Sequence, residues 1–367
     1  MWPLEGVKVL DLTQNVAGPY AAMILAEFGA DVTKVEPNSG DATRSWGPPF
    51  WNGYSPTYLA LNRNKTLVSL DLKTPDGKQA LLRLLDEADV LIVSNRPAAL
   101  KRLELDYDTV SKRYPQLIYA EITAFGHYGP RQMDPGYDPL MQAMGGIMSV
   151  TGHPGDEPVR VGTSVIDMGT GMWMAMGVLS ALRLRDKTGQ GHRITGALFE
   201  TAVGWMAYHL PAYWASGDTP HGWGSGTAMI APYEAFPTTS GWIVIAAGND
   251  KLFRDLSCVL GHPEWSSEEN YKSNAMRVVN RVHLHEEISA VTSTQTSDFW
   301  IQLLVDAGIP VAPVADVAQL MENPQLQASD LIQEAFHADI PNFKSVGLPL
   351  CIDGMRPPLR TVPARKV

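Results

Sequence analysis

The sequence predicts an α/β protein built on an open parallel sheet, and two observations support this fold class. Short runs rich in aliphatic and β-branched residues recur in the first third of the chain, at residues 7–13, 31–36, 66–72, 89–94 and 117–123. The stretches between them carry apolar residues at helical spacing. This alternation is typical of parallel sheets, because each helix returns the chain to the edge where the next strand starts.

The first strand, loop and helix exclude a dinucleotide site of the usual kind. A strand at 7–13 leads into the loop QNVAGP, and a helix is expected at 19–29, with Pro19 in its first turn and Gly29 at its end. A strand follows at 31–36. Nicotinamide-binding folds need G-x-G-x-x-G in this first turn so that the backbone can approach the pyrophosphate. Here one Gly is followed by Pro, so a dehydrogenase is not expected.

The next elements continue the alternation. Residues 76–88 are expected to form a helix, and residues 89–94 (DVLIVS) form the kind of apolar run that is buried in parallel sheets. Two further helices are expected at 137–149 and 168–185, joined by a polar, hairpin-like stretch. Basic residues at the end of the second helix suit the negative end of its dipole.

The second half of the chain predicts a smaller domain. Aromatic, Gly, Pro and Ser residues are frequent from 211 to 240 and indicate a long crossing segment. A strand at GWIVIAAG opens a small α/β unit, and AGIPVAPV indicates a return to a sheet. The expected division is a large domain at 1–205, a linker at 206–228, a small domain at 229–305, and a return of the chain to the large domain at 306–367.

Composition excludes several classes of function. The chain has 367 residues, 29 basic and 39 acidic, and a formal net charge of −10, so a general affinity for nucleic acid or an anionic membrane is not expected. The two cysteines, Cys258 and Cys351, support neither a disulfide framework nor a cysteine-ligated metal. We therefore expect a reduced, cytoplasmic protein without a metal, a signal peptide or a membrane span.

A basic segment lies within this acidic chain. Residues 62–102 hold eight basic and five acidic side chains, a local balance of 8 − 5 = +3. The basic ones are Arg63, Lys65, Lys73, Lys78, Arg83, Arg96, Lys101 and Arg102. Several follow strands, at the edge where open α/β sheets bind ligands. The segment predicts a small, highly anionic ligand, whereas solvated helix charges are the plainer interpretation for Lys78 and Arg83.

Asp167 is the main candidate for chemistry. It stands between the strand-like run VGTSVI and a helix that begins MGTGMWMAM. Free backbone N–H groups and the positive helix end there would keep its carboxylate ionised and nucleophilic. Gly169 and Gly171 would leave room for a substrate. The alternative is a simple N-cap aspartate, which helix starts favour in any case.

Segments spread over nearly the whole chain resemble the class III CoA-transferases, the CaiB/BaiF family. They include VLDLTQNVAGPYAAMILAEFGADVTKVEP, GDATR, NRNKTLVSLDLKTPDGK, ADVLIVSNRP, PQLIYAEITAFGHYGP, GYDPLMQAMGGIMSVTG, VGTSVIDMGTG, RDKTGQGHRI and GIPVAPV with ENPQL. The resemblance implies a Rossmann-like large domain, a smaller α/β domain, and a homodimer whose chains interlock like linked rings. It also implies transfer of CoA between carboxylic acids, with Asp167 forming first an anhydride with the acyl group and then a thioester with CoA.

The same resemblance assigns contacts to coenzyme A, the acyl carrier and only co-substrate expected. Carried over by position, the contacts are Asn15, Val16, Leu70, Lys73, Asn95, Arg96, Arg102, Leu103, Thr123, Phe125 and Gly126. Tyr137 and Gly248 take places near the substrate and in the flap of the small domain. The expected partners are acyl-CoA esters and small carboxylic or dicarboxylic acids.

Some positions depart from the family pattern. Formyl-CoA transferases have Gln at Val16, a basic residue at Pro37, and a glycine run where this chain has AAGND. Arg96 replaces a Phe, so a guanidinium would contact the adenine in place of a stacked ring. The α-methylacyl-CoA racemases of the same family form the alternative. Their catalytic His falls at Tyr137, and a neutral Tyr is a poor base at pH 7, so transfer is favoured.

Overall fold

The computed structural model describes residues 1–363 and divides into two compact units. The first comprises Met1–Ile147, Val161–Leu210 and the described residues from Pro324 onward, and the second comprises Met148–Arg160 and Pro211–Asn323. The chain thus enters the second unit twice, where a single excursion was expected. Residues 148–160 belong there because the Gly224 N–H donates to the Gly152 carbonyl at 2.8 Å. Residues 306–323 belong there because strand β9 pairs with β8.

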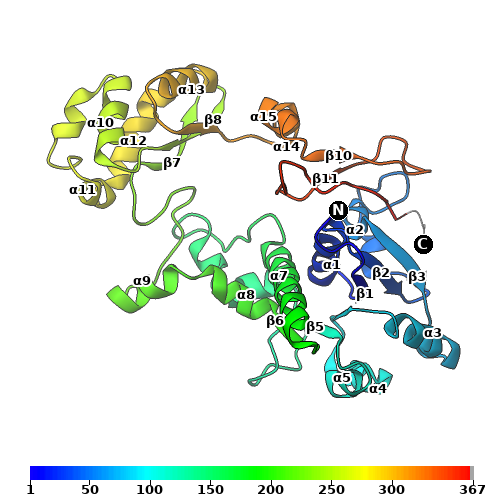
Figure 1. Ribbon diagram of the computed structural model, residues 1–367. Coiled ribbons are helices and arrows are strands. Elements are labelled where there is room, and N and C mark those ends of the chain that lie inside the picture. Colours follow the sequence, from blue (N-terminus) through cyan, green and yellow to red (C-terminus); the bar gives the residue numbers. More distant parts are fainter. Residues whose placement is uncertain (364–367) are drawn as a thin grey trace. The chain divides into compact units, whose positions relative to one another are not determined.

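The first unit contains a six-stranded sheet whose neighbouring strands are all parallel, which confirms the predicted fold class (Figure 1). Its strands are β1 (Lys8–Leu12), β2 (Asp31–Glu36), β3 (Lys65–Ser69), β4 (Val90–Val93), β5 (Ile118–Thr123) and β6 (Arg193–Ala197). They lie in the order β3-β2-β1-β4-β5-β6. The order reverses between β1 and β4, and ligands bind at such a switch point, outside the carboxyl ends of the strands.

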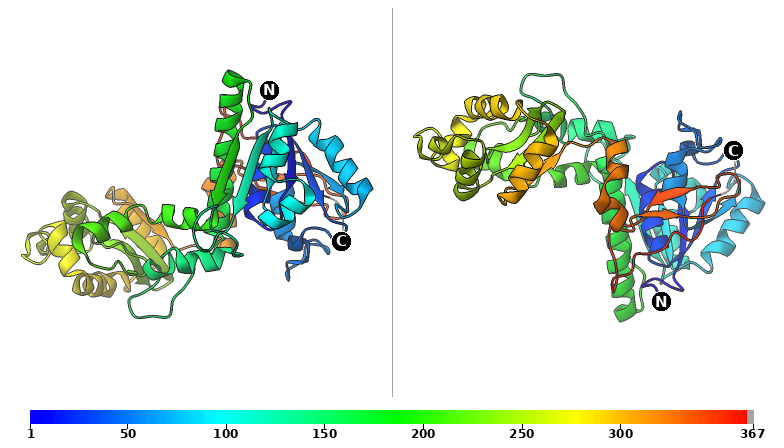
Figure 2. Two further views of the ribbon diagram at one scale, coloured as in Figure 1. Left: turned by 90° about the horizontal axis from the view of Figure 1, so that it is seen from below. Right: turned by 90° about the horizontal axis from the view of Figure 1, so that it is seen from above.

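Helices cover both faces of this sheet. On one face α1 (Ala17–Glu27) and α7 (Val165–Thr188) lie side by side (Figures 1 and 2). On the other face Leu10 and Leu12 of β1 pack with apolar residues of α3 (Pro75–Leu85), α4 (Pro97–Leu103) and α5 (Tyr107–Arg113). Helix α7 is longer than the predicted 168–185. By length and composition alone it could cross a membrane, but half of its most apolar window is buried in the protein, so this is weak evidence for a span.

Smaller elements complete the first unit. They are η1 (Ala42–Ser45), α2 (Pro56–Asn62), α6 (Asp138–Met144), α8 (Leu198–Trp205), the start of α9 (His209–Ser216), α15 (Pro324–Ala328), β10 (Ile332–Glu334) and β11 (Lys344–Val346). The C-terminal segment is tied to the large unit by hydrogen bonds. The Asn64 side-chain oxygen accepts from the N–H groups of Arg360 and Thr361, and Glu27 accepts from the N–H of Leu348.

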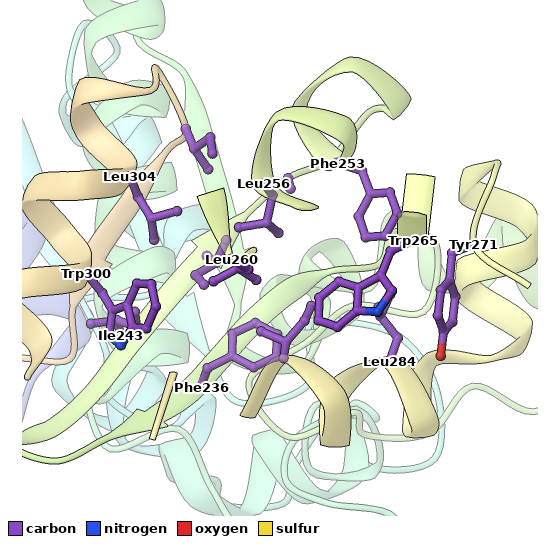
Figure 3. Packing of buried hydrophobic residues seen from close by; sticks show 14 residues of the cluster. Phe236, Ile243, Phe253, Leu256, Leu260, Trp265, Tyr271, Leu284, Trp300 and Leu304 are labelled. Atoms are coloured by element: carbon purple, nitrogen blue, oxygen red, sulfur yellow. The ribbon is translucent and has the colours of Figure 1, made fainter. Parts of the chain in front are cut away.

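The second unit is built on a three-stranded antiparallel sheet in the order β7-β8-β9. Its elements are η2 (Met148–Val150), β7 (Tyr233–Thr238), β8 (Gly241–Ala246), α10 (Asp250–Val259), η3 (Pro263–Ser267), α11 (Asn274–Val279), α12 (Arg281–Thr292), α13 (Ser297–Asp306), β9 (Val311–Pro313) and α14 (Val317–Glu322). Along β8, Ile243 and Ile245 are buried while Trp242 is exposed, as strand geometry requires. Figure 3 shows Ile243 packed in a cluster of apolar and aromatic side chains that forms the core.

Candidate active site

A cavity of about 240 Å³ lies at the switch point of the large sheet. Three of the segments that line it follow the carboxyl ends of β1, β4 and β5, and Asp167 of α7 also faces it. The lining consists of Gln14–Gly18, Trp46, Ser94–Pro97, Ile122–Ala124, Gln132–Tyr137, Asp167 and Leu198. The cavity arises because the crossovers on the two sides of β1 and β4 run in opposite directions and leave a crevice there.

Asp167 is the third residue of α7 and is not its N-cap, which corrects both sequence interpretations. The N-cap is Ser164, whose side chain makes no capping hydrogen bond. Asp138 of α6 caps the helix instead. Its Oδ2 accepts from the N–H of Ile166 at 2.8 Å and from the N–H of Asp167 at 3.1 Å, and its Oδ1 accepts from Gln142 Nε2 at 2.6 Å. The backbone donors that were expected to face Asp167 are therefore already used.

The charge state of Asp167 differs from the expectation for the same reason. Burial, and secondly the negative charge of Asp138, raise its pKa to about 7. The prediction of a carboxylate held ionised by the helix end is wrong, because burial disfavours its charged form and Asp138 already occupies the helix end. A carboxylate of higher pKa is a stronger nucleophile once ionised, and near neutral pH a large fraction of Asp167 is in that form.

Five of the residues predicted to contact CoA line this cavity, namely Asn15, Val16, Asn95, Arg96 and Thr123, and Tyr137 lines it as well. Phe125 and Gly126 lie just beyond, in the loop after β5, where the Gly126 N–H donates to Thr123 Oγ1 at 2.9 Å. The structure thus brings residues from three loops to one place. It does not by itself assign them a ligand.

The other predicted contacts lie away from the cavity lining. Leu70 and Lys73 follow β3, and Lys73 is exposed. Arg102 is exposed on α4, and Leu103 lines a separate hollow of about 230 Å³ with residues of α3 and α5. Lys73 follows β3 and Arg96 follows β4, so both lie at the carboxyl edge of the parallel sheet, but β2 and β1 separate the two strands. Gly248 follows β8 in the second unit.

Two members of the basic segment are not available to a ligand. Arg63 is 5% exposed and its Nε donates to Glu27 Oε1. Lys65 is 5% exposed, and its Nζ donates to Asp11 Oδ2 at 2.9 Å and to Asn62 Oδ1 at 3.0 Å. The expectation that both serve an anionic ligand is wrong, because each cation is neutralised inside the protein. Counting charge along the sequence could not distinguish them from the exposed Lys73.

Sequence reasoning missed several residues of the site. Trp46 and the segment 132–136 come from loops whose sequences carry no periodic signal. Asp138 had a usable signal, since it starts a helix and stands four residues before Gln142, so that both side chains share one helix face. Within residues 1–363, no three His, Cys, Asp or Glu side chains gather in a way that could hold a metal ion.

Comparison with known proteins identifies the class. The model of CoA-transferase family III matches residues 4–364. Human succinyl-CoA:glutarate CoA-transferase is 35% identical over 92% of this chain and 77% of the human protein. Acetyl-CoA:oxalate CoA-transferase of Acetobacter aceti is 35% identical over 90% of this chain and 85% of that protein. A CAIB/BAIF family protein from Brucella suis has a crystal structure that superposes with a TM-score of 0.90 and 35% identity, over 99% of this chain and 96% of the other.

The α/β fold has a cavity at its switch point with the half-buried carboxylate of Asp167 facing it, and the matches identify the class of enzyme. The chain belongs to CoA-transferase family III. It is accordingly an enzyme that moves coenzyme A from an acyl-CoA to a carboxylic acid, as the sequence resemblance implied, and CoA is its co-substrate.

Proposed function

We propose that the protein exchanges CoA between small dicarboxylic acids, with Asp167 as the covalent nucleophile. The observation that carries the proposal is the position of Asp167. Its carboxylate faces the cavity that the β1, β4 and β5 loops form, and no cation pairs with it in the described part of the chain. Relatives named for glutarate and oxalate support the acid class.

The reaction follows four exchanges at carbonyl carbons. An Asp167 oxygen attacks the donor thioester, the carbon–sulfur bond breaks, and CoA leaves as the thiolate. The thiolate then attacks the Asp167 carbonyl of the anhydride, and the donor acid leaves as a carboxylate. The acceptor carboxylate then attacks the aspartyl thioester, and CoA leaves again as the thiolate. The thiolate attacks the acceptor's carbonyl in the new anhydride, which forms the product acyl-CoA and regenerates Asp167. Each step exchanges one anion for another, so no net proton is needed.

The cavity residues have distinct roles in this scheme. Arg96 and the exposed Lys73 and Arg102 supply positive charge for the phosphates of CoA. Asn15, Val16, Asn95 and the loop from Thr123 to Gly126 contact its pantetheine and adenosine parts. The half-buried position of Asp167 limits the access of water, which would otherwise hydrolyse the anhydride.

A homodimer is part of the proposal. Helices α7 and α8 leave large apolar side chains exposed, among them Trp173 and Trp205, which are 51% and 38% exposed. Exposed apolar surface of this kind is typical of an interface. We infer that a second copy of the chain covers it, interlocked as the resemblance implies. Sedimentation of the pure protein at the dimer mass supports this, and a monomer contradicts it.

Succinyl-CoA and a panel of acids (glutarate, oxalate and mesaconate) test the transfer, with the acyl-CoA products identified by mass spectrometry. Asp167→Ala removes the nucleophile, so we expect transfer to fall below detection while the Kd for CoA stays within about twofold. Wild-type protein should carry a CoA adduct on the peptide that contains Asp167.

Asp186→Ala is the matched control, because Asp186 is an exposed carboxylate near the other end of the same helix. It should transfer CoA as the wild type does. Wild-type turnover in Asp167→Ala sinks the mechanism. Solvent deuterium entering the α-carbon of a 2-methylacyl-CoA, without thioester exchange, would instead identify a racemase.

A further inference from the structure

The first loop, residues 13–18, is held from beneath by charged side chains. Five of its residues, from Gln14 to Gly18, line the cavity that Asp167 faces. Asn15 at its tip has φ +67°, a left-handed conformation that Asn tolerates better than most residues. Gly18 packs so closely on Thr13 that an added Cβ would lie 2.3 Å from the Thr13 Cβ. A loop of this shape has little regular backbone hydrogen bonding of its own.

Four charged side chains lie buried below this loop, and they form two ion pairs. Asp11 and Lys34 are 0% exposed, Asp41 is 2% exposed and Lys65 is 5% exposed. Lys34 Nζ lies 2.9 Å from Asp41 Oδ2, and Lys65 Nζ donates to Asp11 Oδ2 at 2.9 Å. Two negative and two positive charges balance. We call Asp11, Lys34, Asp41 and Lys65 the charged base.

The charged base contacts the backbone at the start, at the tip and just past the end of the loop. Lys34 Nζ donates to the Thr13 carbonyl at 2.9 Å. The Asn15 N–H donates to Asp41 Oδ1 at 3.4 Å. Lys65 Nζ donates to the Pro19 carbonyl at 2.8 Å. In addition, Asp11 Oδ1 accepts from both the N–H and the hydroxyl of Thr13, at 2.9 and 2.5 Å.

Stability alone does not account for this arrangement. Removing four charges from water costs several kcal/mol per ion, and well-packed apolar residues of similar size often stabilise a fold as well or better. What apolar residues cannot do is define where a backbone carbonyl or N–H group lies. Charged side chains that hydrogen-bond to the backbone do so, because each bond has a preferred length and direction.

We propose that Asp11, Lys34, Asp41 and Lys65 are positioning residues for the transfer reaction. By holding both ends and the tip of the first loop, they set the distance between a bound acyl-CoA thioester and the Asp167 carboxylate. None of the four touches the reacting atoms. The inference rests on the proposed function, since it assigns the loop to the thioester that Asp167 attacks.

A double variant tests the charged base without leaving a buried charge unpaired. Lys34→Met with Asp41→Asn removes one positive and one negative charge, keeps the side-chain volumes, and leaves an Asn oxygen to accept from the Thr43 and Asn15 N–H groups. A displacement of about 1 Å at a reacting centre costs about 100-fold in rate. We therefore expect kcat/KM for succinyl-CoA, and the rate of adduct formation on Asp167, to fall about 10- to 100-fold.

Arg63→Met with Glu27→Gln is the matched control. This pair is equally buried and belongs to the same unit, but among the described residues its hydrogen bonds join the end of α1 to α2 and to Leu348, and not to residues 13–18. It should destabilise the protein to a similar extent in urea and leave kcat/KM near the wild-type value. Equal kinetic losses in the two double variants, or wild-type kinetics in Lys34→Met/Asp41→Asn, would overturn the proposal.

A milder variant keeps the proposal testable if the double variant fails to fold. Thr13→Val preserves shape and removes only the hydroxyl donor to Asp11, and we expect a fall of about 3- to 10-fold in kcat/KM. Wild-type kinetics in Thr13→Val would then overturn it.

The Kd for CoA, measured by calorimetry, separates the two proposals. If the wild-type protein transfers no CoA, the proposed function is wrong. An unchanged CoA affinity with unchanged kinetics in the variants sinks only the positioning role. A weaker affinity in the variants supports that role even in a protein without transfer activity.

Discussion

The two units of the protein bury different kinds of side chain. The core of the second unit is a cluster of apolar and aromatic residues (Figure 3). Among the described residues of this unit, Arg277 is the one charged side chain that is buried. The first unit buries the charged base, the Glu27–Arg63 pair and Asp138. Among them, the charged base holds the loop that follows β1, at the switch point of the sheet. Apolar packing suffices where a region only has to be stable, whereas defined backbone positions at a site need directional contacts.

The two kinds of core also differ in how their contribution to stability depends on pH. An apolar core gains free energy roughly in proportion to the area it buries, whatever the pH. A buried charge contributes only while its partner is charged as well, so its contribution depends on pH. Measuring the free energy of unfolding against pH therefore tests this difference between the two units.

The largest effect is expected from Asp11→Asn. It leaves the Lys65 ammonium without its closest counter-charge, and breaking a buried pair in this way costs about 3–5 kcal/mol in free energy of unfolding. The Lys65 and Lys34 charges lower the pKa of Asp11 to about 2, against burial, which would raise it. Because this pKa is below its unfolded value of 3.8, the stabilisation is complete above about pH 4 and is lost as the pH falls through about 2.

Urea unfolding at pH 7 and at pH 3 measures this effect. The gap between wild type and Asp11→Asn should narrow at the lower pH. A gap of the same size at both values would mean that Asp11 acts through shape and not through charge.

A comparable but pH-independent loss is expected from Leu256→Ala in the second unit. Leu256 is 0% exposed and packs in the apolar cluster with Phe253 and Trp265. Removing its side chain leaves a cavity, which costs about 2–5 kcal/mol. The same urea experiment should give equal losses at pH 7 and pH 3, and a strong pH dependence would contradict the contrast between the units.

The smallest effect is expected at the nucleophile itself, and its sign is opposite. The raised pKa of Asp167, about 7, lies above its ordinary value of 3.8. The folded protein therefore holds this proton more tightly than the unfolded chain does. The resulting stability is present below about pH 4 and is lost as the pH rises through about 7.

Asp167→Asn should consequently be more stable than wild type at pH 8, by ~1–2 kcal/mol once the solvent screening of this half-buried carboxyl is allowed for, and equally stable at pH 4. Thermal unfolding of both proteins at the two pH values checks this. Lower stability of the variant at pH 8 would show that the charge of Asp167 is well accommodated. Ionisation of Asp167 would then cost the folded protein no stability.

Much of the fold could be predicted because its signals are local. The runs at 89–94 and 117–123 are apolar enough to be central strands, and they became β4 and β5. The parallel sheet follows from the alternation of strands and helices. The second entry into the small unit could not be predicted, because it depends on contacts such as the pairing of Gly152 with Gly224, which are distant in sequence and have no pattern of their own.

The candidate site could likewise be predicted only in part. Asp167 and the loop residues Asn15, Asn95 and Thr123 stand at turns after strands, and the residue types and the family resemblance pointed to them. The charge state of Asp167 did not follow, because burial and the neighbouring Asp138 raise its pKa where the helix end was expected to lower it.

Residue order thus determined the α/β class, the switch-point turns and the identity of the nucleophile candidate, because periodicity and turn chemistry act over a few residues. Only the tertiary structure decided which charges are buried. Arg63 and Lys65 lie in the same basic segment as Lys73, yet the first two are enclosed with Glu27 and Asp11 while Lys73 reaches solvent. The reason is physical: solvation and charge pairing depend on neighbours in space, and those neighbours stand 36 and 54 positions away in the chain.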